Sequence, residues 1–457
     1  MKTSAAPTRV RQGVILFAVT LAIITYVDRV CISQAAPSMR LDLGLTAGQM
    51  GMAFSAFGWA YALCEIPTGW LGDWIGPRRV LLRIVGWWSC FTALTGYVWN
   101  LPSLLLARFC FGMGEAGCFP NLTKAFAIWL LPEERTRAQS IMWMSARWGG
   151  AFTPLLVIWV MSWLSWQNTF VFFGVIGLVW VFFFYRRFRD QPGEHPGVNA
   201  AELELLRANK PTPSTRPRVP WNRLLSSPTV WLLCGQYFCL TYGWFFYITW
   251  LPSYLTEAHG LALDHNALMQ WLEGWLRGMF SAETTHKLLL AALAGVPLFF
   301  GGLGSSLCGL LTPLLVHASG SVTWARRALA VLGFSGAAGL LVWSFYIRDP
   351  LWAMLVMGLA SLCNDLTMPG SWSTCMDVGG RYAGTLSGSM NMMGSVGAAI
   401  APLAIGFILD HTQHNWALIF WISGIIYFLG GLCWFWIDPV TPLESGHEKA
   451  QKACSFP

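Results

Sequence analysis

Long apolar runs separated by short polar segments fill almost the whole chain of 457 residues. A membrane-spanning helix needs roughly 20 mostly apolar residues, and twelve runs reach that length. They lie at about 13–34, 50–71, 80–99, 101–124, 138–163, 168–186, 229–255, 287–314, 327–346, 351–373, 383–409 and 416–437. The pattern predicts an all-α membrane protein with twelve transmembrane helices.

The longest polar segment among these runs, 187–227, divides them into six and six. Its proline content without periodicity is typical of a linker, with one short helix expected around 201–208. We therefore expect an N-terminal six-helix bundle over 1–190, a cytoplasmic linker over 191–227 and a C-terminal six-helix bundle over 228–457. The other long segment, 257–285, contains LMQWLEGWLRGMF, which predicts an amphipathic surface helix.

The composition supports a lipid bilayer as the partner of this chain. Only 11% of residues are charged and the mean hydropathy is +0.50, whereas soluble domains carry about 25% charged residues. The net charge of +7 is spread without a dense basic patch, so nucleic acid is not expected as a partner. The 12 cysteines show no paired metal-ligand spacing, so neither a metal nor another cofactor is expected.

Basic residues collect in one set of the predicted loops and so predict the orientation. This set holds Lys2, Arg9, Arg11, Arg78, Arg79, Arg83, Arg135, Arg137, Arg186, Arg187, Arg189, Arg326, Arg327, Arg381, Lys449 and Lys452. The opposite loops hold mainly Arg40, Arg277, Lys287 and Arg348. By the positive-inside rule, both termini are predicted to be cytoplasmic, in a multi-pass protein of the inner (plasma) membrane. We expect a monomer.

A weak internal repeat suggests that the two halves are related. RWGGAFTPLL at 147–156 matches SVGAAIAPLA at 395–404, with small residues and a proline at the same places. Many transporters are built from such repeats, with the binding site at the midplane between them.

The loop between the second and third runs carries a recognisable motif. It reads Gly69-Trp70-Leu71-Gly72-Asp73-Trp74-Ile75-Gly76-Pro77-Arg78-Arg79. The pattern G-x-L-x-D-x-x-G-x-R-R resembles the signature of the major facilitator superfamily, which implies two pseudo-symmetric six-helix bundles. Asp73 and Arg79 are the expected cytoplasmic gate. Asp73 would cap a helix of the other half, and the arginines would pair with acids such as Glu133, Glu134 or Asp377.

Further motifs give a closer resemblance, to the anion:cation symporter family. They are Tyr26-Val27-Asp28-Arg29, Arg108-x6-Glu115, Phe54-Ser55-Ala56-Phe57 with Tyr61, Trp250-Leu251-Pro252-Ser253-Tyr254-Leu255, Ser371-Trp372 and Asn391. The family includes bacterial galactonate and other sugar-acid permeases, and the vesicular glutamate and sialic acid carriers. The resemblance covers nearly the whole chain and implies a symporter of an organic anion, with the proton as the coupling ion.

Six of the charges inside the predicted spans are candidates for the site. A charge at a helix centre costs about 2.5–3.5 kcal/mol, so these side chains should face a watery cavity or one another. They are Asp28, Arg29, Arg108, Glu115, Arg147 and Asp365. Arg108 and Glu115 share a helix face but are offset by roughly 10 Å, so Arg108 need not neutralise Glu115. We expect Glu115 to carry the proton, with Asp28 and Arg108 beside it; a static ion-pair network is the alternative.

The remaining site residues are expected to bind the substrate. Arg29 offers a planar fork to a carboxylate, while Tyr61, Ser371 and Asn391 would bind hydroxyls and Trp372 would cover the carbon chain. Arg147 would either bind another anionic end or be neutralised by Asp365. Asp365 itself would either pair with an arginine or bind substrate hydroxyls. In galactonate-type permeases the position of Arg147 looks like a glutamine, so galactonate itself is less well supported than another aldonate, a uronate or an aldarate.

Other functions fit the sequence less well. A drug exporter of this superfamily often carries G-P-x-x-G-G in its fifth span, which is absent from 148–154. A sugar-phosphate exchanger could use two arginines, but would not require Asp28 and Glu115. No phosphate loop, HExxH helix or nucleophile–base pair indicates an enzyme. A sensor that transports nothing would be distinguished by uptake assays.

Overall fold

The computed structural model describes residues 6–207, 219–251, 254, 267–278, 282–412 and 415–443. Some residues of the sequence predictions lie outside the described residues. They are Lys2, Lys449 and Lys452 of the predicted topology, residues 208–218 of the predicted linker, and Pro252, Ser253 and Leu255 of the seventh-span motif. The part of the predicted outer insertion at 257–266 also lies outside them.

The long helices fall into two groups along the chain. The first group is α1 (Val10–Asp42), α2 (Ala47–Ile75), α3 (Pro77–Thr95), α4 (Leu101–Glu115), α5 (Cys118–Trp129), α6 (Pro132–Met161) and α7 (Trp166–Arg187). The second group is α10 (Pro228–Thr249), α13 (Ala282–Ser319), α14 (Val322–Phe345), α15 (Pro350–Gly379), α16 (Ala383–His411) and α17 (Trp416–Trp436). Short elements are η1 (Pro192–Glu194), α8 (Ala200–Arg207), α9 (Trp221–Ser226), α12 (Ala267–Arg277) and η3 (Gly380–Tyr382).

Every predicted run corresponds to a helix, but the fourth is not continuous. It divides into α4 and α5 because Ala116 leaves the helical conformation and Gly117 takes a left-handed one, with φ +81°. A Cβ atom at Gly117 would lie 2.1 Å from the Oγ1 atom of Thr68 on α2. A glycine is thus needed both for the turn and for the close approach of α2.

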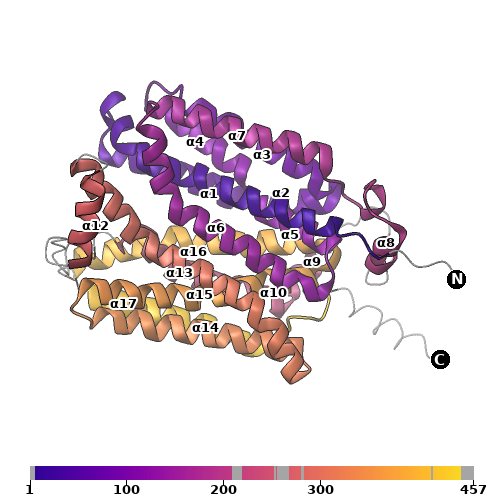
Figure 1. The fold of residues 1–457 in the computed structure, drawn as a ribbon. Coiled ribbons are helices and arrows are strands. Elements are labelled where there is room, and N and C mark those ends of the chain that lie inside the picture. The colour runs from indigo at the N-terminus through magenta and orange to yellow at the C-terminus, as the bar shows by residue number, and fades with distance from the viewer. Residues whose placement is uncertain are drawn as a thin grey trace, which may run out of the picture.

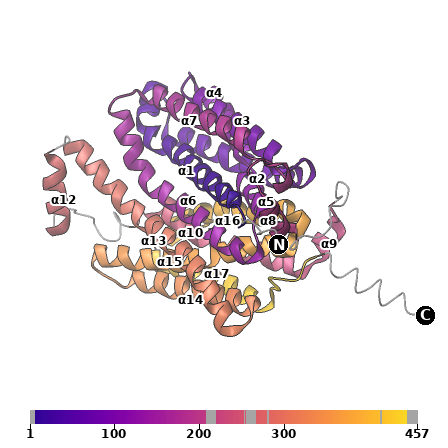
Figure 2. The same cartoon turned by 45° about the vertical axis from the view of Figure 1, so that its right-hand side comes forward.

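The two groups of helices lie side by side, as Figures 1 and 2 show. One end of the molecule carries α8 and α9 with the start of α1, and the opposite end carries α12 (Figure 1); we call these the α8 end and the α12 end. The groups meet along two seams, in which α6 packs against α13 and α2 packs against α16. The two copies of the internal repeat lie in α6 and α16, so each contributes to one seam.

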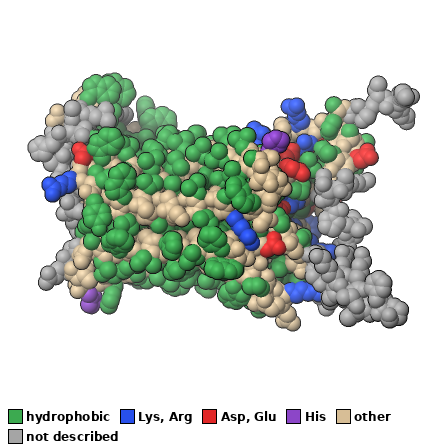
Figure 3. All heavy atoms as spheres, turned by 90° about the horizontal axis from the view of Figure 1, so that it is seen from below, with side chains coloured by type: hydrophobic (Ala, Val, Ile, Leu, Met, Phe, Trp, Pro, Cys, Tyr) green, Lys and Arg blue, Asp and Glu red, His purple; other side chains and the backbone are tan. Residues whose placement is uncertain are grey.

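The outer surface is that of a protein embedded in lipid. Hydrophobic side chains cover the middle of the face in Figure 3, and most charged side chains gather toward its ends. Exposed tryptophans include Trp59, Trp163, Trp343 and Trp421, each more than half exposed. By length and composition alone, six stretches of the described chain are apolar enough to cross a membrane, and they include α1, α7 and α13–α17.

The predicted linker contains more structure than expected. The short helix predicted around 201–208 is α8, whereas η1 and α9 were not predicted. Glu202 of α8 is fully buried and accepts hydrogen bonds from the backbone N–H groups of Val10 and Arg11 at the start of α1. Arg11 also pairs with Glu202 at 3.1 Å and with Glu134 of α6 at 3.0 Å. The carboxylate therefore caps α1 and ties α8 to the first group of helices.

The docking of α8 can be tested by replacing its buried acid. Glu202→Ala should lower the free energy of unfolding by about 0.5–2 kcal/mol, the value of a helix cap, because the first N–H groups of α1 lose their acceptor. Thermal unfolding of the purified protein measures the change. Glu204→Ala, on the exposed face of the same helix, is the matched control and should change little. Equal melting temperatures for both variants would contradict the docking.

Candidate functional site

Most charged residues of the spans lie near the middle of their helices, while Glu115 ends α4 at the break before α5. Most of these residues are paired. Arg29 of α1 donates from Nε to the Oε1 atom of Glu115 on α4 at 2.5 Å. Glu115 is fully buried, while the Arg29 side chain keeps 23% exposure. The Arg29 guanidinium also lies over aromatic rings, 4.6 Å from the Tyr61 centroid and 5.5 Å from that of Phe57. Arg29, expected to meet the substrate, is therefore already bound to an acid.

Asp28 and Arg108 are buried close enough to Glu115 to interact with it electrostatically. The Trp88 indole of α3 donates to Oδ2 of Asp28 at 3.1 Å, and Oδ1 has no hydrogen-bond partner among the described residues. Arg108 is buried over the rings of Phe57 and Phe111. It interacts electrostatically with Glu115 and Asp28 without an ion pair to either within the described part of the chain. Two acids and two arginines thus share one buried region.

Arg147 and Asp365 form an ion pair between the two groups of helices. Arg147 of α6 donates from Nε and Nη2 to the two carboxylate oxygens of Asp365 on α15, at 2.5 and 2.7 Å. Both residues are at most 1% exposed. Arg147 also donates to the Tyr26 hydroxyl at 3.3 Å, and its guanidinium lies 3.9 Å from the Trp244 ring centroid. Of the two arrangements expected for Arg147, this structure contains the one neutralised by Asp365.

Tyr61 and Asn391 meet at the α2–α16 seam around an acid that sequence reasoning missed. The Asn391 amide donates to the Tyr61 hydroxyl at 3.2 Å and to Oε1 of Glu65 at 2.7 Å. Glu65 is fully buried, and its Oε2 atom has no partner among the described residues. Glu65 stands in the predicted second span, so the rule that singled out the other charges would have found it.

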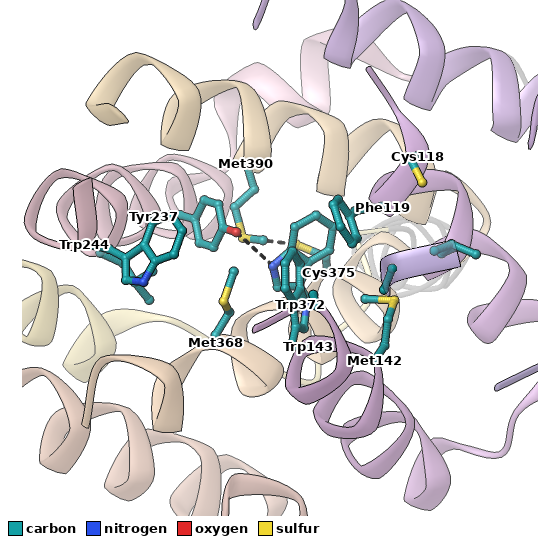
Figure 4. Close-up of a cluster of buried hydrophobic side chains, with 14 of the residues drawn as sticks. Cys118, Phe119, Met142, Trp143, Tyr237, Trp244, Met368, Trp372, Cys375 and Met390 are labelled. Carbon is teal, nitrogen blue, oxygen red and sulfur yellow. Dashed lines mark hydrogen bonds between the residues drawn. The ribbon is translucent and has the colours of Figure 1, made fainter. Parts of the chain in front are cut away.

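Ser371 and Trp372 make no hydrogen bond to these charged residues within the described part of the chain. Ser371 is fully buried within the second group and donates to Gln236 of α10 at 3.3 Å. Trp372 belongs to an aromatic cluster of Phe119, Trp143, Tyr237 and Trp372, shown in Figure 4. Its indole donates to the Tyr237 hydroxyl at 3.1 Å, and its ring centroid lies 5.2 Å from that of Trp143.

This aromatic cluster joins helices from both groups. Phe119 and Trp143 come from α5 and α6, and their stacked rings are 4.5 Å apart. Trp143 is one turn nearer the α8 end than Arg147, and Trp372 is two turns nearer that end than Asp365. The cluster therefore lies between the charged residues and the α8 end, and the expected contact of Trp372 with the carbon chain of the substrate stays a prediction.

Asp73 caps a helix of the other group, as its motif predicted. Its carboxylate accepts from the backbone N–H groups of Gly384 and Thr385 at 3.1 and 2.6 Å, and from the Thr385 hydroxyl at 2.6 Å. These residues begin α16. Lys124 of α5, which was not predicted, pairs with Asp73 at 2.9 Å. A Cβ atom at Gly69 would lie 2.4 Å from the Gly384 carbonyl oxygen, so the two helices touch at this end.

The pairing expected for the motif arginines is wrong. Arg79 is exposed and has no hydrogen bond or ion pair to a described residue, and Arg78 donates to the Tyr185 carbonyl. The acids proposed as their partners bind other arginines: Asp377 binds Arg135 and Arg326, and Glu134 binds Arg11. Those arginines begin helices packed beside the acids, whereas Arg78 and Arg79 begin α3 on the outer side of the first group.

The family follows from the whole chain. Residues 18–402 match the Major Facilitator Superfamily. The chain belongs to this superfamily, and it is a membrane transporter and not an enzyme. The predicted fold class is thereby confirmed.

Relatives from bacteria and plants match almost the entire chain. The probable sulfoacetate transporter SauU of Cupriavidus necator is 34% identical over 431 residues, which cover 93% of this chain and 94% of that protein. The probable galactarate/D-glucarate transporter GudP of Escherichia coli is 31% identical over 438 residues, covering 90% of each chain. Probable anion transporter 1 of rice chloroplasts is 30% identical, covering 93% and 76%. These relatives agree with the resemblance to anion:cation symporters.

Solved structures share the fold. The proton:xylose symporter XylE, bound to 6-bromo-6-deoxy-D-glucose, has a TM-score of 0.69 at 12% identity, covering 96% of this chain and 98% of that one. The human organic anion transporter MFSD10 has a TM-score of 0.60 at 15% identity, covering 93% and 97%.

The Asp73 cap can be tested without a substrate. Asp73→Asn keeps the shape of the side chain but removes its charge, which is worth about 0.3–2 kcal/mol at a helix N-terminus. The amides of Gly384 and Thr385 should then exchange hydrogen for deuterium several-fold faster in mass spectrometry. Glu133→Gln, an exposed acid at the same end, should leave this exchange unchanged. Unaltered exchange in Asp73→Asn would show that the cap does not hold the seam.

Proposed function

We propose that the protein is a proton-coupled symporter that carries an organic anion by alternating access. The substrate is a sugar acid of the aldonate, uronate or aldarate type, or a small sulfonated acid like the one named for the relative in Cupriavidus necator. The observation that carries the proposal is the Arg29–Glu115 pair, in which an arginine whose side chain keeps 23% exposure is held by a buried carboxylate.

Anion selection follows from the arginines. Arg29, Arg108 and Arg147 all lie near the middle of their helices, and Arg29 is the one that keeps appreciable exposure. A guanidinium binds a carboxylate or sulfonate through two parallel hydrogen bonds. The rings of Tyr26, Phe57 and Tyr61 surround Arg29 and restrict its orientation. A neutral sugar would leave this cation without a new partner.

Proton coupling follows from competition for Arg29. While Glu115 is ionised, it occupies the guanidinium that the substrate needs. A proton on Glu115 removes that competitor, and a substrate anion on Arg29 leaves Glu115 without its cation, which favours the neutral acid because burial opposes a lone charge. Proton and anion therefore promote each other's binding. Asp28, with one unpaired oxygen beside Arg108, is a partner in the same proton exchange.

Alternating access would use the two seams. The α2–α16 contacts of Asp73, the Arg135–Asp377 pair and the aromatic cluster all lie between the charged site and the α8 end. We take the α8 end as the cytoplasmic end because the basic loops collect there. These contacts then form the gate that closes toward the cytoplasm, and they must separate before the substrate leaves on that side.

The substrate class can be tested on purified protein. Galactarate, D-glucarate, D-galactonate, D-glucuronate, sulfoacetate, sugar phosphates and neutral sugars are compared by thermal shift and by uptake into proteoliposomes. A true ligand stabilises the protein by RT ln(1 + [L]/Kd). At least one acid should raise the melting temperature and enter vesicles faster when a proton gradient is imposed. Stabilisation by neutral sugars alone would refute the proposal.

The role of Glu115 in coupling predicts a separable defect. Glu115→Gln mimics the protonated acid and releases Arg29, so the variant should exchange substrate across the membrane but lose accumulation driven by a proton gradient. Counterflow and uphill uptake in proteoliposomes measure the two activities. Glu133→Gln is the control and should retain both. Uphill uptake by Glu115→Gln at the rate of the unchanged protein would rule out this role.

The role of Arg29 predicts a loss of affinity. Arg29→Lys keeps the charge but removes the planar fork, so binding of the anion should weaken by about 1.5–3 kcal/mol, the value of a hydrogen bond to a charged group. Calorimetric titration with the acid identified above gives the dissociation constant. Arg79→Lys, at an exposed arginine far from the site, should bind normally. Equal affinity in the two variants would mean that Arg29 does not bind the anion.

A further inference from the structure

A second arginine–carboxylate pair repeats the arrangement of Arg29 and Glu115. The Arg147–Asp365 pair is bidentate, and both residues are at most 1% exposed. Whereas Arg29 and Glu115 belong to the first group of helices, this pair joins α6 of the first group to α15 of the second.

Tyr26 connects the two pairs. Its hydroxyl accepts from Arg147 at 3.3 Å, and the Arg29 Cζ atom lies 5.8 Å from its ring centroid. One tyrosine side chain therefore contacts both guanidinium groups. Two anion-binding groups this close can be reached by a single small molecule that carries an acid at each end.

We propose that the substrate is a dianion and that Asp365 is a second proton-binding residue. The inference rests on the proposed proton-coupled function and extends it to the second pair. One acidic group of the substrate replaces Glu115 on Arg29, and the other replaces Asp365 on Arg147. The carboxylate of Asp365, once released, binds a proton that arrives as hydronium from the medium to which the site is open, and it becomes a neutral carboxylic acid while the hydronium becomes water.

The surroundings of Asp365 favour this exchange. A buried carboxylate that loses its cation is strongly destabilised unless it is neutralised. Among the described residues, the ionisable groups that interact electrostatically with it are Arg147 of α6, Tyr237 and Tyr247 of α10, and Tyr427 of α17, and Arg147 is the cation in this set. A Cβ atom on Gly301 would lie 2.4 Å from Oδ2 of Asp365, so the backbone of α13 closes the remaining side.

Hydrogen-bond acceptors for the neutral acid stand next to it. The Asn364 amide donates to Oδ1 of Asp365 at 2.9 Å. Oδ1 of Asn364 and Oγ of Ser361 are buried and have no hydrogen-bond partner among the described residues. Either oxygen can accept the carboxylic proton after a side-chain rotation. The acid can thus be stabilised in both forms, by Arg147 when ionised and by its neighbours on α15 when protonated.

The test uses a double variant, Arg147→Gln with Asp365→Asn. This replacement removes both charges together and keeps polar side chains of similar size, so no buried charge is left unpaired. The control is Arg135→Gln, which removes another pair between α6 and α15 near the α8 end and leaves Asp377 paired with Arg326. The probes are two diacids and their one-acid counterparts: D-glucarate with D-gluconate, and sulfoacetate with 2-hydroxyethanesulfonate.

In proteoliposomes, the unchanged protein should carry at least one diacid in preference to its one-acid counterpart. The double variant should lose affinity for that diacid by about ten- to a hundredfold, while uptake of the counterpart persists. The number of protons moved per diacid, from the reversal potential at several pH gradients, should fall by one. The control variant should alter both uptake rates alike and leave the preference and the proton number unchanged.

Three results would overturn the inference. In the first, the double variant has the same diacid preference and the same proton number as the unchanged protein. In the second, the unchanged protein transports each diacid and its one-acid counterpart equally. In the third, the unchanged protein transports neither diacid. If the unchanged protein moves protons with its substrate and Glu115→Gln abolishes uphill uptake, such a result removes the role of Asp365 alone. If the unchanged protein moves no protons with any acid, the proposed function fails as well.

Discussion

The structure depends on one constraint, which is that a charge buried among apolar helices must find an opposite charge or a hydrogen-bond donor. Glu115 is held by Arg29, Asp365 by Arg147, and Glu65 by the Asn391 amide. Each partner comes from a different helix, so satisfying the constraint also fixes how the helices are rotated and which of them are neighbours. The charges of this protein therefore organise its interior as much as its apolar residues do.

The same constraint places polar contacts between the two halves. Apolar packing alone would give a strong and non-directional contact, whereas the seams contain polar contacts that, under the proposed function, a proton or an anion replaces. The cap that Asp73 of α2 forms on the start of α16 is such a contact, and so is the pair of Arg147 with Asp365. Each joins one group of helices to the other. The aromatic cluster between them adds a barrier to water without adding a charge. A transporter of this superfamily needs contacts that are specific and yet can be exchanged, and paired buried charges meet both needs.

Sequence patterns predicted the helices well because length and apolarity are local properties. They also predicted the Asp73 cap, because the motif places that acid at the end of one helix. The break between α4 and α5 was missed because a single glycine interrupts an otherwise continuous apolar run. Glu65 and Lys124 were missed although the sequence marks both as charges within spans. The expected partners of Arg78 and Arg79 were wrong because pairing between loops depends on which helix ends meet.

By itself, the sequence determined that this chain lies in a membrane, that it has twelve spans, and that a small set of charges must be satisfied inside them. It limited the chemistry to anions and carboxyl groups, because arginine and acid side chains are the ones present at those depths. Only the tertiary structure decided that Arg29 meets Glu115 and that Arg147 meets Asp365. Those choices depend on the rotation and contact of helices whose paired residues are 86 and 218 positions apart, and no local pattern along the chain specifies them.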